Sequence, residues 1–143
     1  MNEPSRKRTA PDERLRGRDT IHRLFETGFS ARRGRVVARF VFSDARPTPL
    51  RCGVATSRRI PNAVVRNRCK RWLREAVREH KGESIQRLHD LNRSVDVMFI
   101  WMDPRVNAGM KLLPEISRSV HELFDTISAA ALPGHDSPLD RAH

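Results

Sequence analysis

Hydrophobic residues repeat along this chain with two different periods, and each period predicts one type of element. Apolar side chains recur with helical spacing in Leu15–Thr27, Ala63–His80 and Met110–Leu132, which predicts three helices. In Arg35–Phe42 and Arg51–Ser57 the residues instead alternate in character from one position to the next, which is typical of strands with two different faces. The pattern therefore predicts both helices and strands in one chain.

A further apolar segment lies between the second and third helices. Val95–Met102 is hydrophobic at every position except Asp96 on its border, so we expect a strand that is covered on both faces. The two earlier strands are close in sequence, and Pro47 and Pro49 mark a turn between them, which predicts a hairpin. The order helix, two or three strands, helix, strand, helix indicates an α+β fold with helices packed on a small sheet.

The chain length limits the number of domains. The 143 residues fit a single domain, which we expect over residues 13–131. Residues 1–12 are polar and contain Pro4 and Pro11, which predicts a disordered basic arm. Residues 132–143 have the same character and predict a flexible tail.

Composition and charge exclude several classes of protein. The 28 Lys and Arg residues outnumber the 17 Asp and Glu residues, giving a net charge of +11 and a pI near 11.3, so we expect a polyanionic partner and no small-molecule substrate. The longest apolar run, Val97–Met102, is far shorter than the roughly 20 residues of a bilayer span. We expect neither a membrane segment nor a secretion signal, and hence a cytoplasmic protein. Cys52 and Cys69 are too few for a disulfide framework or a structural zinc site.

The excess charge is concentrated around the second predicted helix. Residues 51–81 hold ten Lys and Arg against two Glu, whereas residues 82–143 are net acidic. On a helical wheel of about 100° per residue, polar side chains of this helix share one face and apolar side chains form a stripe opposite. The polar face consists of Arg66, Asn67, Lys70, Arg71, Arg74 and Arg78. Five like charges repel one another, so this face is unfavourable without a polyanion.

Three interpretations of the basic face are open at this point. It is a solvated helix surface, a surface for RNA, or a helix that enters the major groove of DNA. A helix that reads the DNA groove needs side chains that recognise base edges, and Asn67 is the single candidate. Arg58 and Arg59 add two cations just before the helix, which favours nucleic-acid binding over a solvated surface.

The residues around this helix resemble those of a known family. The segment from Arg58 to Glu75 reads RRIPNAVVRNRCKRWLRE, and its Arg66-Asn67-Arg68 core resembles the signature of the protein subunit of bacterial ribonuclease P. The resemblance extends over the chain except for its two ends. It implies an α-β-β-β-α-β-α fold similar to the second domain of ribosomal protein S5, with a left-handed crossover through the second helix.

The same resemblance implies a division of labour between protein and RNA. In the family, an RNA subunit removes the 5′ leader of precursor tRNA with Mg²⁺ ions that it binds itself, and the protein supplies neither a catalytic group nor a cofactor. The implied partners are ribonuclease P RNA and precursor tRNA, and the implied activity is endonucleolytic formation of the mature tRNA 5′ end. The alternative is a ribosomal or chaperone-type RNA-binding protein with the same fold.

Two groups of site residues follow from the resemblance. The residues expected to contact the RNA subunit are Arg58, Arg59, Arg66, Asn67, Arg68, Lys70, Arg71, Arg74 and Arg78. The leader is expected to lie in a cleft between the first helix and the open face of the sheet, where side chains stack on its bases. The residues expected to line this cleft are Arg16, Ile21, Phe25, Arg39 and Ser57.

Some positions of the expected cleft depart from the family pattern. Ile21 stands where Phe is frequent and Arg39 where Tyr is frequent, so we expect stacking by the Arg39 guanidinium in place of a ring. Alternatively, Ile21 and Phe25 are ordinary core residues. Gly53 and Ala55 lack bulk, which predicts room in the cleft for a nucleic-acid strand.

The other chemistry-bearing residues predict no catalytic or metal site in the protein. The six histidines are scattered along the chain, and the aspartates lack the spacing of metal ligands. Trp72, Trp101 and Cys69 fall on stripes that we expect to face the core, which predicts packing roles for them.

Overall fold

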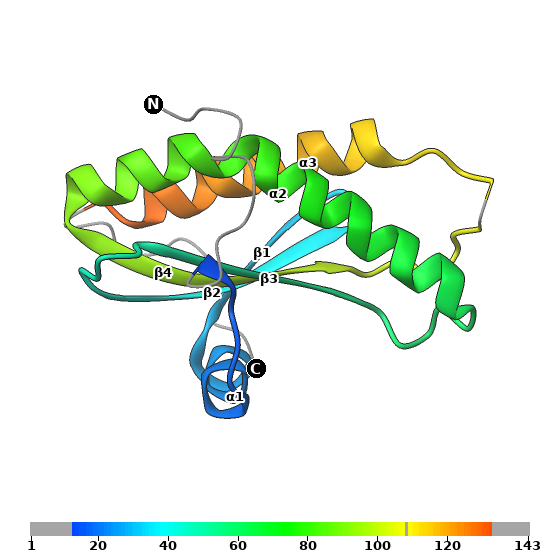
Figure 1. The fold of residues 1–143 in the computed structure, drawn as a ribbon, viewed down its shortest axis with the longest axis horizontal. Coiled ribbons are helices and arrows are strands. Elements are labelled where there is room, and N and C mark those ends of the chain that lie inside the picture. The colour runs from blue at the N-terminus through cyan, green and yellow to red at the C-terminus, as the bar shows by residue number, and fades with distance from the viewer. Residues whose placement is uncertain (1–12, 108, 133–143) are drawn as a thin grey trace.

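The computed structural model describes residues 13–107 and 109–132, so the predicted arm over residues 1–12 and the predicted tail beyond Leu132 lie outside the described residues. The described chain follows the order α-β-β-β-α-β-α (Figure 1). This order confirms the α+β class and the arrangement that the resemblance implies. The elements are α1 (Arg18–Thr27), β1 (Phe29–Arg33), β2 (Val36–Asp44), β3 (Leu50–Thr56), α2 (Ala63–Leu91), β4 (Arg93–Trp101) and α3 (Leu113–Ala130).

The strands form one mixed sheet in the order β1-β2-β4-β3. β1 and β2 are antiparallel and are joined by a tight turn at Gly34, whose φ of 58° is one that glycine adopts without strain. β2 and β4 are also antiparallel, whereas β3 and β4 are parallel. Parallel strands need a crossover connection, and α2 provides it.

The predicted hairpin between residues 35–42 and 51–57 is wrong. β4 lies between the two corresponding strands, β2 and β3, in the sheet. Every residue of β4 after Arg93 is buried, because its neighbours pair with both of its edges and helices α2 and α1 pack on its two faces. Periodicity also missed β1, because its five residues, FSARR, are too few and too polar to give a repeating signal.

All three predicted helices have displaced ends in the structure, and α3 spans Leu113–Ala130 instead of residues 110–132. α2 ends at Leu91 instead of His80. Gly82 disfavours a helix by about 1 kcal/mol, but Leu88 continues the buried stripe of α2 beyond it. α1 begins at Arg18 instead of Leu15, because the backbone N–H of Leu15 donates to the carbonyl oxygen of Cys52 (2.9 Å) beside β3.

The helices cover the two faces of the sheet unequally. α2 and α3 pack together on one face, and α1 lies on the other (Figure 1). The main core lies under α2 and α3, and the predicted alternation of β2 is confirmed there, since Val36, Ala38 and Phe40 are buried in it. A second, smaller core under α1 consists of Leu15, Leu24, Met98 and Ile100. Of the helices described, none has the length and apolar character that would let it traverse a bilayer.

Candidate nucleic-acid interface

The first half of α2 is fixed in rotation by its cap and its apolar stripe. The Asn62 side chain caps the helix, as predicted, by accepting from the backbone N–H groups of Val64 (2.8 Å) and Val65 (3.3 Å). The stripe on the sheet side is buried and consists of Val65, Cys69, Leu73, Ala76 and Val77. Because these side chains point into the core, the polar positions between them are directed outward.

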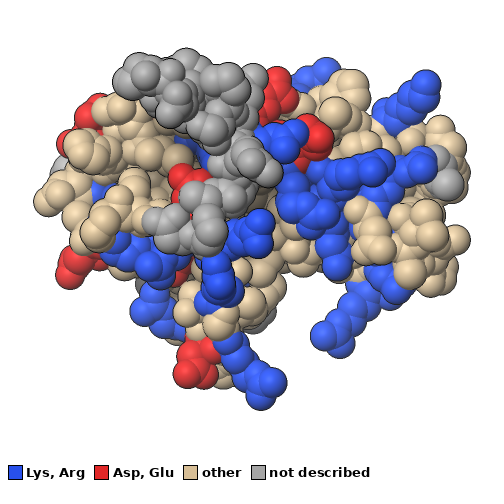
Figure 2. Space-filling view, viewed as in Figure 1, with Lys and Arg blue, Asp and Glu red and all other residues tan. Residues whose placement is uncertain are grey.

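The polar positions form one surface, which we call the basic face of α2: Arg66, Asn67, Lys70, Arg71, Arg74 and Arg78. Asn67, Arg71 and Arg74 are exposed, and the other members are half-buried. Nη1 of Arg66 donates to the carbonyl oxygen of Ile60 at 2.6 Å, which orients this guanidinium toward the start of the helix. Figure 2 shows a band of Lys and Arg side chains over the region of α2 that carries this face.

Carboxylates compensate the charge at one end of the basic face. Nη2 of Arg78 lies 2.5 Å from Oε1 of Glu75 on the same helix. For Lys70, Arg71 and Arg74, by contrast, the described residues provide no carboxylate within ion-pair distance. These three positive charges therefore produce a field that attracts a polyanion.

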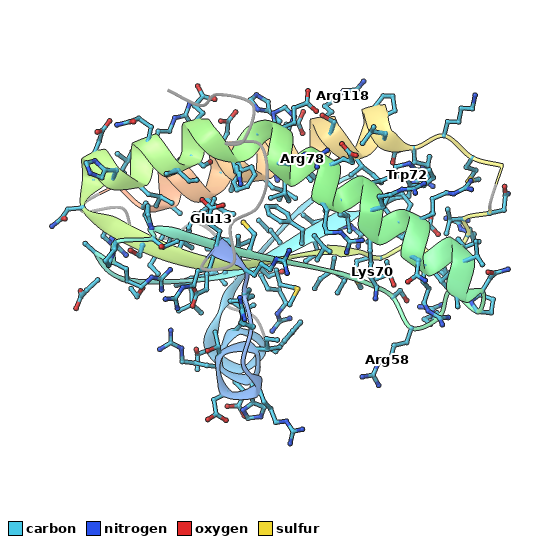
Figure 3. All side chains as sticks on the ribbon, viewed as in Figure 1. Glu13, Arg58, Lys70, Trp72, Arg78 and Arg118 are labelled. Atoms are coloured by element: carbon cyan, nitrogen blue, oxygen red, sulfur yellow. The ribbon has the colours of Figure 1, made fainter. Side chains whose placement is uncertain are left out.

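Three further predicted RNA-binding residues flank the basic face. Arg58 and Arg59 are exposed in the turn between β3 and α2, and Figure 3 shows Arg58 projecting from it. The turn is anchored by the fully buried Ile60, and the backbone N–H of Arg59 donates to Oγ of Ser57 at 3.1 Å. Arg68 is half-buried on the border of the face.

Two pockets follow the edge of β3 beside the basic face. The first has a volume of about 380 Å³ and is lined by Val54, Ala55, Thr56, Arg58, Arg66 and Lys70. The second, of about 370 Å³, shares Val54 with the first and adds Arg14 and Arg74. Arg14 and the edge of β3 were not predictable from the sequence, because the neighbours of a strand are set by sheet topology.

On the opposite side of the sheet, Phe25 of α1 and Arg39 of β2 come together. Cζ of Arg39 lies 4.7 Å from the centre of the Phe25 ring, and Nη2 of Arg39 donates to the carbonyl oxygen of Phe25. Phe25 remains 37% exposed. Burial lowers the pKa of Arg39, and its Nε finds no hydrogen-bond partner among the described residues. The predicted stacking by Arg39 is therefore made on the protein's own Phe25 ring.

The other predicted cleft residues have different surroundings. Ile21 is half-buried and packs with part of its side chain on the small core under α1, whereas Phe25 is exposed enough to leave its ring accessible. Arg16 is exposed before the start of α1. Ser57 is half-buried directly after β3.

On the α1 side of β3, the room predicted over Gly53 is filled by the protein itself. A Cβ atom at Gly53 would lie 3.1 Å from Sδ of Met98 and 3.4 Å from Cβ of Leu15. Ala55 packs on the same small core. The prediction of open space at Gly53 is therefore wrong, because its missing side chain accommodates Met98 and Leu15.

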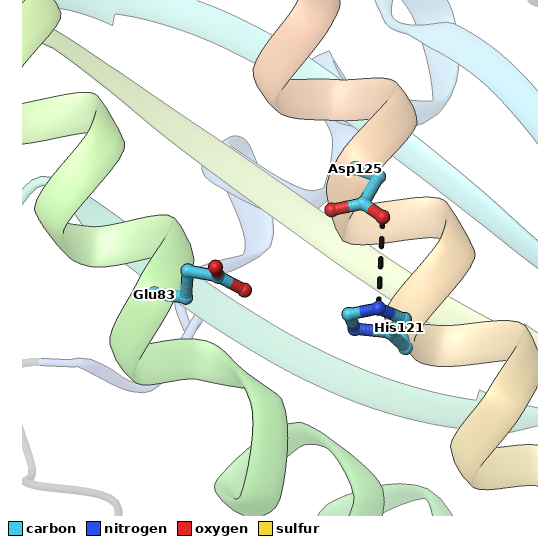
Figure 4. Close-up of side chains that lie close together, drawn as sticks. All are labelled: Glu83, His121 and Asp125. Carbon is cyan, nitrogen blue, oxygen red and sulfur yellow. Dashed lines mark ion pairs between the residues drawn. The ribbon is translucent and has the colours of Figure 1, made fainter.

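One cluster of titratable residues was not predicted from the sequence. Glu83 of α2 and His121 and Asp125 of α3 have nitrogen and oxygen atoms within 4.8 Å of one another (Figure 4). The fold thus brings His121 beside two carboxylates, a proximity that the scattered positions of the histidines did not predict. Arg87 lies 3.4 Å from Glu83 and 3.0 Å from Asp125, and it compensates both carboxylates. The cluster is thus an exposed ion-pair network that joins α2 to α3.

The predicted packing roles of both tryptophans and of Cys69 are confirmed. Trp101 is fully buried, and its Nε1 donates to the carbonyl oxygen of Asp103 at 2.7 Å. Trp72 is partly buried against the main core. Cys69 is fully buried, and burial raises the pKa of its thiol, so the thiol is protonated and packs as a small apolar group.

Together, the fold and the site define a small α+β protein with one concentrated cationic helix face. The family model for ribonuclease P matches residues 10–128, which is most of the chain. The chain therefore belongs to the family of ribonuclease P protein components.

Individual relatives agree with this family. The chain is 32% identical over 111 residues to the ribonuclease P protein component of Bacillus velezensis, covering 78% of this chain and 85% of that protein. It is 33% identical over 125 residues to that of Symbiobacterium thermophilum, covering 78% and 88%. Both proteins are matched over nearly their whole length, so the family resemblance concerns the entire domain.

Solved structures share the fold. An RNase P protein structure from Staphylococcus aureus superimposes with a TM-score of 0.60 at 21% identity, covering 80% of this chain and 94% of that chain. The RNase P protein from Thermotoga maritima gives a TM-score of 0.56 at 24% identity, covering 78% and 94%. At these identities the likeness establishes a common fold.

Proposed function

We propose that this ribonuclease P protein component binds the catalytic RNA subunit through the basic face of α2, together with Arg58, Arg59 and Arg68. The observation that carries this proposal is the set of Lys70, Arg71 and Arg74, whose charges the described carboxylates leave uncompensated. Such cations release counterions when they contact phosphates, and this release drives the association.

The 5′ leader of precursor tRNA, in this proposal, binds on the α1 side of the sheet. The exposed ring of Phe25 offers a surface for a base, and Arg39 holds that ring in place while adding positive charge. Arg16, Ile21 and Ser57 complete the proposed leader site. The leader and the RNA subunit would therefore contact different faces of the domain.

Catalysis in this proposal belongs to the RNA subunit and to the Mg²⁺ that it binds. The protein contributes cations between two polyanions, the RNA subunit and precursor tRNA. Positive side chains at that junction reduce the repulsion that Mg²⁺ would otherwise have to screen. The protein is therefore expected to matter most when Mg²⁺ is scarce.

Reconstitution tests the proposed function. The full chain is combined with a bacterial ribonuclease P RNA, and cleavage of precursor tRNA is measured at low Mg²⁺. We expect strong stimulation, and, for about six neutralised phosphates, a slope of log K against log salt near −4 to −5. Binding to ribosomal RNA without any stimulation of cleavage would instead favour a ribosomal or chaperone-type role.

A leader variant tests the second surface. Phe25→Ala is expected to weaken binding of precursor tRNA to the holoenzyme about tenfold, because a stacked base contributes roughly 1–3 kcal/mol. Binding of mature tRNA, which lacks the leader, is expected to remain unchanged. His22→Ala, at an exposed position of the same helix, serves as the matched control. Equal losses for precursor and mature tRNA would contradict a leader site at Phe25.

A further inference from the structure

β3 has an edge that the sheet leaves unpaired. β3 is the terminal strand of the sheet, so β4 pairs with only one of its edges. The backbone N–H of Ser57 donates to the carbonyl oxygen of Trp101 (2.8 Å), and the carbonyl oxygen of Pro49 accepts from the N–H of Val95 (2.8 Å). At both ends of β3, therefore, the backbone groups of odd-numbered residues are directed toward β4. Backbone groups alternate in direction along a strand. The even-numbered residues, Val54 and Thr56, therefore direct their N–H and C=O groups to the free edge.

The chain before α1 covers only the first part of this edge. Arg14 forms a parallel bridge with Cys52, and the N–H of Leu15 donates to the Cys52 carbonyl oxygen. The segment then leaves the sheet and enters α1. Among the described residues, none pairs with the outward backbone groups of Val54 and Thr56.

Cations surround the uncovered part of the edge. The pocket of about 380 Å³ is lined by Val54 and Thr56 of β3 together with the cations Arg58, Arg66 and Lys70. We call this pocket the edge groove. Figure 3 shows that Lys70 and Arg58 come from α2 and from the turn before it, so the groove opens beside the basic face.

The chemistry of the edge groove suits a nucleotide. An unpaired strand edge presents donors and acceptors side by side, and so does the Watson–Crick edge of an unstacked base. Cations next to that edge suit the phosphates on either side of such a base. A protein strand could use the same backbone groups, but a strand carries no regular row of anions for Arg58 and Lys70.

We propose that the edge groove receives an unstacked nucleotide of the bound RNA, with the base edge hydrogen-bonded to the backbone of Val54 and Thr56 and the adjoining phosphates on Arg58 and Lys70. This inference rests on the proposed function and adds base recognition to it. The basic face then supplies affinity, and β3 supplies a contact that depends on the base.

Amide hydrogen exchange tests the groove in the unmodified full chain. The probes are a short single-stranded RNA of mixed sequence and an abasic ribose-phosphate oligomer of the same length. With the RNA, exchange of the Val54 and Thr56 amides is expected to slow about tenfold; with the abasic oligomer it is expected to stay as in the free protein. The Ala55 amide faces β4 and serves as the internal control.

A backbone variant provides the second test. Val54→Pro removes an outward N–H without removing a bond to β4, as proline at a free edge allows. Its affinity for the RNA is expected to fall about fivefold, as for one lost hydrogen bond, and its affinity for the abasic oligomer to stay unchanged. Val54→Ala keeps the N–H and controls for loss of the valine side chain, so its affinity for the RNA is expected to exceed that of Val54→Pro.

The outcomes separate this inference from the proposed function. Equal amide protection by both probes, or protection by an acidic peptide and not by RNA, would overturn base recognition while cleavage stimulation could still stand. Failure to stimulate cleavage would overturn the proposed function. The amide protection would still show whether the edge groove binds a base. If Val54→Pro does not fold, judged by circular dichroism, the exchange result on the unmodified chain decides.

Discussion

The basic face of α2 and the loop around Arg46, between β2 and β3, use the same type of side chain for opposite purposes. Nη2 of Arg46 lies 3.0 Å from Oδ1 of the buried Asp96, whereas Lys70, Arg71 and Arg74 have no carboxylate partner in the described chain. A paired guanidinium holds the fold together, and an unpaired one is available to a partner. The position of the carboxylates, more than the number of cations, therefore locates the binding surface.

A second paired cation, Arg35, forms ion pairs with two carboxylates and contacts an aromatic ring. Arg35 lies 2.6 Å from Glu115 and 3.1 Å from Asp103, and its Cζ lies 4.9 Å from the Trp101 ring centre. Hydrogen bonds to Glu115 and Asp103 raise the pKa of Arg35. These contacts join α3 to the end of β4, so this cation stabilises tertiary structure.

The largest expected effect reverses charge on the unpaired cations. The triple variant Lys70→Glu, Arg71→Glu and Arg74→Glu is expected to lower affinity for ribonuclease P RNA on the order of 1,000-fold, because three charge-assisted contacts become repulsive. Filter binding at constant salt measures the loss. Arg118→Glu, at an exposed position of α3, is the control and is expected to bind normally. A similar loss for Arg118→Glu would contradict a localised surface.

Removing a paired cation is expected to act on stability. Arg46→Met leaves the Asp96 carboxylate, whose side chain is 5% exposed, without its ion pair. The free energy of unfolding is expected to fall by about 3 kcal/mol, measured by urea denaturation. Arg71→Met, on the exposed basic face, is expected to change it by less than about 0.5 kcal/mol. Comparable losses in both variants would remove the distinction between the two regions.

The ion pairs of Asp103 are expected to make stability depend on acid pH. The backbone N–H of Arg105, Arg35 and the Arg105 side chain lower the pKa of Asp103 from 3.8 to about 2. A carboxylate whose pKa is lower in the folded than in the unfolded chain stabilises the fold at pH values above the unfolded pKa. This stabilisation is lost as the pH falls from about 4 to 2 and the carboxylate becomes protonated. The stability advantage of the unmodified chain over Asp103→Asn should therefore shrink by about 2 kcal/mol across that range. Chemical denaturation at each pH measures it, and a constant difference would contradict the assignment.

The smallest expected effect converts a paired cation into an unpaired one. Glu75→Gln removes the carboxylate 2.5 Å from Arg78 and extends the uncompensated part of the basic face. Affinity for ribonuclease P RNA is expected to rise about twofold, since an exposed ion pair contributes less than about 1 kcal/mol. Glu122→Gln on α3 is the control and is expected to leave affinity unchanged. A decrease for Glu75→Gln would show that Arg78 needs its partner to face the RNA.

The local features of the fold were predictable from the sequence. The Asn62 cap, the buried stripe of α2 and the alternation of β2 depend on side chains within a few residues of one another. The burial of β4 was predictable as well, because every side chain from Val95 to Trp101 except Asp96 is apolar. Periodicity alone, in contrast, placed β2 and β3 in a hairpin, since it contains no information about which strands become neighbours.

The candidate site likewise combines features that helical spacing predicts with features that depend on tertiary packing. The outward direction of Lys70 and Arg74 follows from helical spacing, so the sequence predicts the basic face. The stacking of Arg39 on Phe25 and the filling of the space over Gly53 require α1 to pack across the sheet, which no local pattern encodes. The same holds for the cluster around His121, which exists because α2 and α3 lie together.

The gathering of positive charge on one side of α2 follows from the order of residues alone, because side chains three and four positions apart lie on the same face of a helix. The position of β4 between β2 and β3, which leaves the free edge of β3 beside that charge, follows only from the assembled fold. Strands choose their neighbours by burying whole faces, and those faces assemble from segments far apart in the chain.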